Sequence, residues 1–203
     1  MESDFTKLLP NQEKSEERFE FIQDETLKSN LAIVLRYIVF LVNLERYNGL
    51  TGPILFPLYK DMIVQTATIV ESCTHYIVRR YLDSNTVKNP EIMDELWIEE
   101  RKEILLEIDG GERRVCGVVE HKGTEKFTKY TQFINLNRAC KRAKIFSEKS
   151  FKASEILRES RNKIHLSGLS KVEMFYTKKD VDDHFNYASI VLKRIEEKLQ
   201  ELR

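Results

Sequence analysis

Apolar residues recur every three or four positions in several long segments of the chain, which is the spacing of one buried face of an α-helix. These segments are residues 25–48, 53–82, 128–146, 150–168 and 177 to the C-terminus. None of them shows the strict alternation of a half-buried strand. We therefore predict an all-α fold, a bundle of long up-and-down helices that forms a single domain over residues 1–203.

The first two segments differ from the others in their polarity. Residues 1–23 are polar and acidic, which indicates a loose N-terminal arm or a short first helix. Residues 25–48 are apolar nearly all round, as expected for a helix that is central in a bundle or faces a second subunit. The most apolar part, residues 31–42, is too short to span a bilayer, so no membrane association is predicted.

The middle of the chain changes from helical to alternating pattern. Asn89-Pro90 is a good helix start, and a helix through about residue 101 is predicted. Two short strands, residues 104–108 and 115–120, then flank the glycine turn at residues 109–111. We predict a β-hairpin insertion over about residues 103–122; one continuous helix over residues 91–108 is the alternative.

The charges cancel over the whole chain but not locally. Thirty-three basic and thirty-three acidic residues give a pI of about 6.9, which argues against a protein that coats nucleic acid by charge alone. Residues 91–112 are strongly acidic, whereas residues 126–165 are strongly basic and could hold a polyanion by its backbone. The alternative is a solvated basic face that pairs with the acidic segment of the same chain. The cations predicted to bind RNA are Arg138, Lys141, Arg142 and Lys144.

Several classes of site have no support in the sequence. Three cysteines without a CxxC pair predict reduced thiols in a cytoplasmic protein. No paired metal-ligand signature, phosphate-binding glycine loop or nucleophile motif occurs. We therefore predict neither a metal nor another cofactor.

The polar stripe on the predicted helix at residues 150–168 is the candidate site. At 100° per residue, Arg158, Arg161, Asn162 and His165 fall within about 100° of one another. Histidine can transfer protons near neutral pH, and arginine binds phosphate oxygens through its planar fork. Such a set can cleave RNA without a metal. The alternative is that His165 lies near the negative end of the helix dipole on an ordinary solvated face.

A carboxylate elsewhere bears on this stripe. Glu71 on the second long helix could reach an arginine of a neighbouring helix, or form a surface pair with His75 one turn away. The residue spacing favours the surface pair.

Residues 157–166, LRESRNKIHL, resemble the signature of the HEPN superfamily, whose members carry an arginine, four to six residues and a histidine on a late helix of a compact bundle. Arg158 followed by six residues and His165 fits that spacing. Arg161 is one residue too close, although Arg161-Asn162 resembles the Arg-Asn pair of these proteins. The tyrosine found two residues past the histidine in some branches is replaced by Ser167. The order of long helices agrees with the family, and the hairpin is an insertion.

The resemblance implies a metal-independent RNA endonuclease, acting as a toxin or an antiviral defence effector. It also implies a homodimer whose motifs face each other across one cleft, products with 2′,3′-cyclic phosphate and 5′-hydroxyl ends, and regulation by an antitoxin or another protein. His165 would transfer protons, Arg158 and Arg161 would hold the scissile phosphate, and Asn162 would orient them. The alternatives are a non-catalytic helical module that binds RNA, a nucleotide or a partner protein, and a purely structural role for the stripe.

Overall fold

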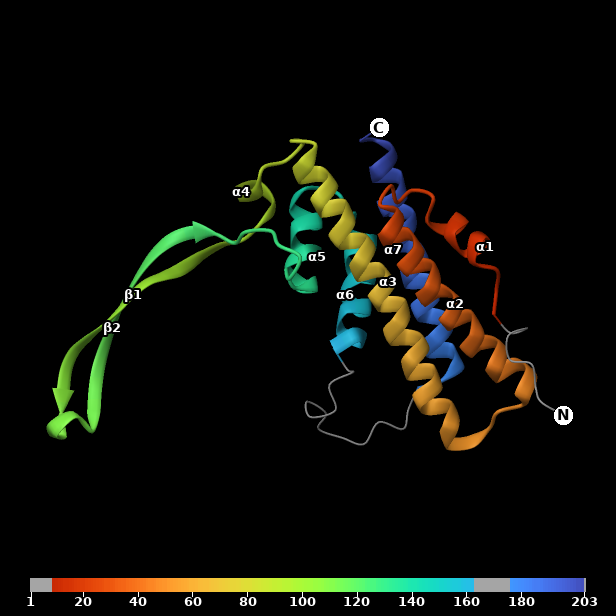
Figure 1. The fold of residues 1–203 in the computed structure, drawn as a ribbon, viewed down its shortest axis with the longest axis horizontal. Helices are drawn as coiled ribbons and strands as arrows, with labels where there is room; N and C mark the ends of the chain where they lie inside the picture. Colours follow the sequence, from red (N-terminus) through yellow and green to blue (C-terminus); the bar gives the residue numbers. More distant parts are fainter. Residues whose placement is uncertain (1–8, 163–175, 203) are drawn as a thin grey trace.

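The computed structural model of the chain describes residues 9–162 and 176–202. It is mostly helical, with one two-stranded antiparallel sheet that projects from the bundle (Figure 1). The central element is helix α3 (Leu55–Asp83), which packs against α2, α5, α6 and α7. Its side chains are buried along most of its length, so the main core of the protein lies around α3.

Helix α2 (Glu25–Asn48) has the predicted bounds. Asp24 caps its first turn by accepting a hydrogen bond from the Leu27 backbone N–H at 3.0 Å, and Gly49 ends it in the left-handed conformation with φ 56°. Of the two alternatives predicted for α2, a central position in the bundle is wrong, and a contact with a second subunit stays a prediction. One side of α2 packs on α3 and α1, while Ile33 on another side is 54% exposed.

By length and apolar composition alone, α2 is also the one helix in the described part of the chain that could cross a membrane. A core helix of a soluble protein meets the same two criteria, so this finding assigns no membrane role.

The segment before α2 is not a loose arm over the residues described. It forms helix α1 (Gln12–Glu16) and a 3-10 turn (Glu17–Phe19), followed by core side chains. Phe19 and Ile22 are 3% and 1% exposed, and Arg36 of α2 donates from Nε to the Pro10 carbonyl at 2.9 Å. The apolar residues hidden in an acidic sequence therefore fix this segment to the bundle, as in the alternative of a short first helix.

The hairpin is longer than predicted and starts earlier. Helix α4 (Asn89–Ile92) has a single turn, and strands β1 (Glu95–Ile108) and β2 (Arg113–Thr124) follow. Both the predicted helix through residue 101 and the alternative of one helix over residues 91–108 are wrong. The chain leaves the helix at Met93, which is extended, and Arg142 of α5 donates from Nη2 to the Ile92 carbonyl at 2.6 Å.

Helices α5 (Phe133–Arg142), α6 (Glu148–Asn162) and α7 (Lys178–Gln200) complete the bundle. α5 is shorter than the predicted residues 128–146. Before it, the Thr131 hydroxyl accepts a hydrogen bond from the Thr128 N–H at 2.9 Å, a local contact that competes with helix formation. The sequence Thr177-Lys-Lys-Asp180 predicts a capping box at the start of α7. The structure confirms it, since Thr177 and Asp180 bond each other's backbone N–H groups.

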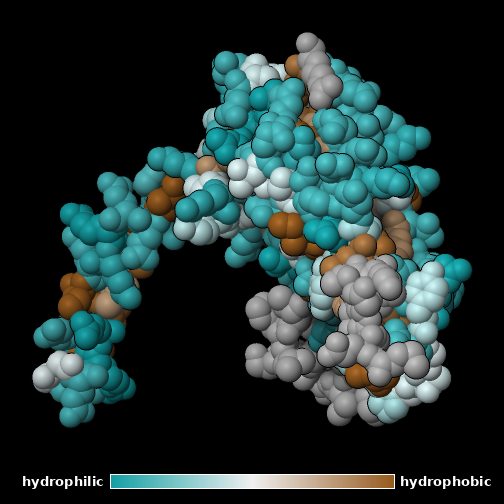
Figure 2. All heavy atoms as spheres, turned by 45° about the vertical axis from the view of Figure 1, so that its right-hand side comes forward, coloured by the Kyte–Doolittle hydropathy of each residue, from teal (hydrophilic) through white to brown (hydrophobic). Residues whose placement is uncertain are grey.

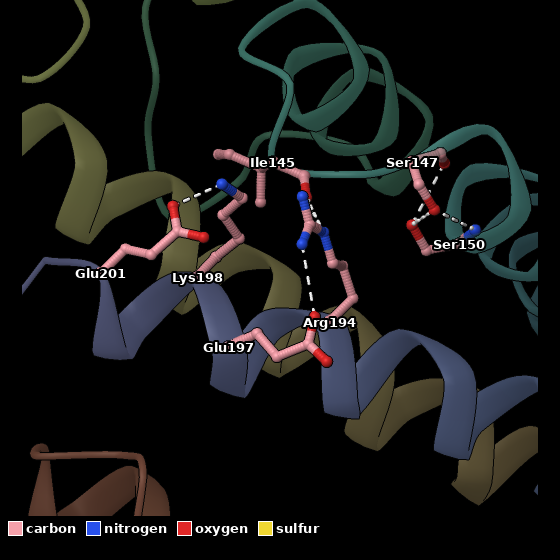
Figure 3. A network of polar contacts seen from close by, with 7 residues as sticks. All are labelled: Ile145, Ser147, Ser150, Arg194, Glu197, Lys198 and Glu201. Carbon is pink, nitrogen blue, oxygen red and sulfur yellow. Dashed lines mark hydrogen bonds and ion pairs between the residues drawn. The ribbon is translucent and has the colours of Figure 1, made fainter.

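One arginine joins α7 to the turn between α5 and α6 (Figure 3). Arg194 donates from Nε to the Ile145 carbonyl at 2.8 Å and from Nη1 to Glu197 at 3.3 Å. At the start of α6, the Ser147 hydroxyl accepts from the Ser150 N–H at 3.2 Å. These contacts fix the direction in which α6 leaves the turn and therefore the position of the residues at its far end.

Candidate functional site

A cavity of about 470 Å³ lies where the end of α6 meets the side of α3 and the beginning of α5. Because α5 and α6 are joined by a tight turn, the last residues of α6 come to lie beside the first residues of α5. The residues that line the cavity are Glu71, Lys129, Tyr130, Thr131, Gln132, Phe133, Ile134, Arg158, Arg161 and Asn162.

Three of the four residues of the predicted stripe line this one cavity. Arg158, Arg161 and Asn162 all come from the last turns of α6, whose opposite flank is anchored in the core by the fully buried Leu157. His165 and Gly168, the fourth stripe residue and the predicted helix end, lie outside the described residues. The described histidines, which are His75, His121 and His184, do not line the cavity.

Arg158 is held by carboxylates of its own helix. Its Nε and Nη2 bond Glu155 Oε2 at 3.1 and 3.0 Å, and its side chain is only 15% exposed. Glu155 is in turn fixed by Asn137 of α5, whose Nδ2 donates to Oε1 at 2.6 Å, and Asn137 accepts from the Ser154 hydroxyl at 2.7 Å. This chain of hydrogen bonds, which runs from the buried Ser154 and Asn137 to the partly buried Glu155, sets the orientation of the guanidinium.

Arg161 forms an ion pair with Glu71 of α3 through Nε. The residue spacing favoured a surface pair of Glu71 with His75, and that prediction is wrong. Glu71 instead pairs with an arginine of a neighbouring helix, as in the alternative. His75 instead contacts the Thr128 carbonyl through Nε2 at 3.0 Å. The Arg161 Nε is buried without a well-aligned acceptor, so the pair is a close approach of charges rather than a formed hydrogen bond.

Burial controls the titration of this carboxylate. Loss of solvent raises the pKa of Glu71, and the charge of Arg161 opposes that rise without cancelling it. The cavity therefore contains a carboxylate whose charged form is disfavoured beside two arginines.

The segment before α5 supplies site residues that the sequence analysis did not single out. Lys129 and Tyr130 both line the cavity, with the Lys129 Nζ 5.0 Å from the centre of the Tyr130 ring. Tyr130 is 79% exposed, so most of its ring is open to solvent at the cavity. The signal in the sequence was the basic character of this stretch, but only the folded turn places it against the end of α6.

Comparisons with protein-family models, with curated proteins and with solved structures return no match for this chain.

The cations predicted to bind RNA lie at the other end of α5. Arg142 is bonded to the Ile92 carbonyl and forms an ion pair with Asp94, and Arg138 Nη1 is 3.9 Å from the same carboxylate. Lys141 pairs with Glu148 at 3.3 Å, while Lys144 is exposed. Arg138 and Arg142 therefore pair with the acidic segment of the same chain. This pairing is the alternative to polyanion binding that the sequence left open for the basic residues.

The cavity has the composition of an anion site. Three cationic side chains and one carboxylate line it. In the part of the chain that the structure describes, no hydrogen bond occupies Arg158 Nη1 or either Nη atom of Arg161. Nor does a group of three His, Cys, Asp or Glu side chains lie together there as metal ligands would. The arrangement can therefore bind a phosphate through guanidinium N–H groups.

Proposed function

We propose that this protein is a metal-independent RNA endonuclease of the HEPN type, and that it acts as a toxin or an antiviral defence effector. The observation that carries the proposal is that Arg158, Arg161 and Asn162 of the motif line the same cavity, together with Lys129. Residues scattered over an ordinary exposed face would not converge in this way.

The described residues would act on the phosphate. Arg158 is already oriented by Glu155, so its free Nη1 can bind a phosphate oxygen with little loss of side-chain entropy. Arg161 would exchange its contact with Glu71, whose charged form burial already disfavours, for a second phosphate oxygen. The exposed ring of Tyr130 offers a surface on which an unpaired base can stack.

Proton transfer is assigned to His165, which follows Asn162 in the motif. In the proposed reaction an imidazole takes the proton of the ribose 2′-hydroxyl, the 2′-oxygen attacks phosphorus, and the 5′-oxygen of the next nucleotide leaves with a proton. The products are a 2′,3′-cyclic phosphate and a 5′-hydroxyl. One chain has one such histidine, so two chains would supply the base and the acid at a shared cleft.

The second candidate is a non-catalytic helical module that binds RNA, a nucleotide or a partner protein. The observation that favours it is that Arg158 and Arg161 each already face a carboxylate of this chain. If those pairs persist when RNA is bound, the cavity would hold the strand without activating it.

Cleavage of a 5′-labelled RNA in EDTA tests the proposal. We expect the full-length chain to cut, and His165→Ala to cut at least about 100-fold more slowly, because general acid–base groups contribute about 10²–10⁴ in rate. His121→Ala is the matched control, since His121 lies on the hairpin and outside the cavity. A cyclic phosphate at the new 3′ end should be detected.

Two outcomes separate the candidates. Equal cleavage by the parent and His165→Ala would contradict the mechanism. Salt-sensitive RNA binding that is lost in Arg161→Ala but kept in Lys152→Ala, with no product after long incubation, would establish the binding module instead. Lys152 is on the same helix, exposed and away from the cavity, so it controls for the loss of one positive charge.

A further inference from the structure

The β-hairpin formed by β1 and β2, called the arm here, has no packing partner in the part of the chain that the structure describes. Its strands have 14 and 12 residues and pair only with each other. The arm stands away from the helices in Figure 1, and apolar side chains are open to solvent along it in Figure 2. An isolated two-stranded hairpin is marginally stable in water, whereas a third strand makes a sheet stable.

The two outer edges of the arm are not equivalent. The pairing register skips a residue twice, and both skipped residues, Glu100 and Leu105, are on β1. Bulges of this kind twist a strand and disturb its row of hydrogen-bonding groups. Strand β2 pairs without interruption from Arg113 to Thr124, so its outer edge is the regular one and is able to accept another strand.

The sequence of β2 is complementary to itself when two copies run antiparallel about Gly117. Residues directly opposite each other in an antiparallel pair lie on the same face and interact. The pairs that meet in this register are Cys116 with Val118, Val115 with Val119, and Arg114 with Glu120, each of them twice. Small residues meet at the centre, valines meet next to them, and opposite charges meet outside.

We propose that two copies of this chain associate through β2, with the Gly117 residues opposite each other on a two-fold axis. The result is a four-stranded antiparallel sheet in the order β1, β2, β2 of the second copy, β1 of the second copy. Such an interface is isologous, because each contact of the first chain with the second is repeated in the opposite direction.

The charges within one arm favour this pairing. Glu120 lies opposite Glu99 in the register of its own hairpin, and like charges in that position are destabilising. Neither Arg114 nor Glu120 forms an ion pair in the described part of the chain, and both are exposed. Arg114 of the second copy gives Glu120 the cation that its own arm does not provide.

Exposed apolar side chains of the arm lie beside Gly117, where the proposed two-fold axis passes. A Cβ at Gly117 would lie 2.9 Å from Leu105 Cδ1, so the Leu105 side chain covers the glycine. Leu105 is 64% exposed, and Val115 and Val119 on the same face are 46% and 43% exposed. When the two glycines meet, each leucine and each valine gains an apolar neighbour from the other chain.

A different protein could add a strand to the same edge, but the self-complementary charges favour a second copy. The β1 edge is a poorer site for a copy of itself. It is bulged, and antiparallel pairing of β1 with β1 about Lys102 would place two lysines opposite each other. Both proposals need two chains, so a monomeric parent would contradict the shared cleft as well as this interface. Substitutions in β2 test the interface without touching the cavity, and His165→Ala tests cleavage without touching β2, so these variants separate the two proposals.

Reversal of single charges tests the interface. We expect sedimentation equilibrium of the full-length chain to show a species of twice the 24.0 kDa chain mass. Glu120→Arg places arginine opposite Arg114 of the other copy at two points, and Arg114→Glu places glutamate opposite Glu120 at two points. Each change should raise the dimer dissociation constant at least about tenfold.

A mixture of the two variants is the decisive measurement in this experiment. One chain then carries two cations at these positions and the other two carboxylates, so both cross-strand pairs are restored and a mixed dimer should form. A merely local effect on the arm would not be repaired by mixing. A monomeric parent, or variants that dimerise as tightly as the parent, would overturn the proposal.

Disulfide formation gives the register directly. In Val118→Cys the new thiol lies opposite Cys116 of the other copy, at a separation that a disulfide can span. Mild oxidation should give a covalent dimer on a non-reducing gel. Val119→Cys is the control, because its side chain is on the other face and opposite Val115. A monomer band from Val118→Cys, or equal cross-linking of both variants, would overturn the register.

Discussion

The helical bundle and the arm of this protein differ in the burial of their side chains. In the bundle, residues such as Ile77 and Leu157 are fully buried, and buried polar groups such as Asn137 have hydrogen-bond partners. In the arm, every residue from Glu99 to Val115 is exposed, and the strands contact little but each other. The chain therefore combines a bundle that has its own hydrophobic core with an arm that has none.

The two regions are suited to different functions. A rigid scaffold can hold guanidinium groups in a fixed orientation, which is what phosphate binding at α6 requires. A long exposed strand edge cannot do this, but it is suited to joining chains. The two parts meet at one place, where Arg142 of α5 bonds the Ile92 carbonyl and pairs with Asp94 at the base of the arm.

The same substitution in the two regions should have very different effects. Leu157→Ala removes a fully buried side chain and should lower the free energy of unfolding by about 2–5 kcal/mol. Leu106→Ala changes a side chain that is 57% exposed and should lower it by no more than about 0.5 kcal/mol for the monomer. Urea unfolding at several protein concentrations measures both. Equal losses would contradict the comparison.

Loss of the cap of α7 should have an intermediate effect, confined to the bundle. Thr177→Ala removes the side chain that accepts from the Asp180 N–H and donates to its carboxylate, at a cost of about 1 kcal/mol. These bonds hold the pKa of Asp180 below its ordinary value, so their stabilisation is present above that value and is lost as the pH falls through the lowered pKa. The stability difference between parent and variant should therefore shrink on acidification below about pH 4.

The smallest effect is expected at Glu71. Burial raises the pKa of this carboxyl, so the stability it contributes is present below the ordinary carboxyl pKa and is lost as the pH rises through the raised one. Glu71→Gln does not titrate. The parent should therefore lose stability relative to Glu71→Gln as the pH is raised from 4 to 7, in thermal or urea unfolding. A parent that gains stability relative to the variant over this range would show that the Arg161 charge, and not burial, controls the pair.

The sequence predicted the long helices well because their signals are local. The apolar period and the caps at Asp24 and Gly49 define α2, and the Thr177–Asp180 box defines the start of α7. The arm was only partly predicted. Residues 95–103 contain four carboxylates and a tryptophan, a composition that does not separate strand from exposed helix, and the pairing with β2 that decides between them is not local.

For the candidate site, helix geometry was sufficient to group Arg158, Arg161 and Asn162, because all three are on one helix. It could not place Glu71 or Lys129 beside them, since those residues approach only through the packing of α3 and the turn before α5. The four cations predicted to bind RNA were chosen by local charge alone. The long-range contacts of Arg138 and Arg142 with Asp94 could not be derived from it.

Removal of the arm is the most direct test of the claim that the bundle folds alone and the arm joins two chains. The Glu125 N–H bonds the Asp94 carbonyl at 3.0 Å, so the two ends of the arm are adjacent and a two-residue turn can replace residues 95–124. Sedimentation equilibrium and urea unfolding of this shortened chain should show a folded monomer, within about 1 kcal/mol of the parent monomer in unfolding free energy. A chain that fails to fold, or one that still dimerises like the parent, would contradict the account.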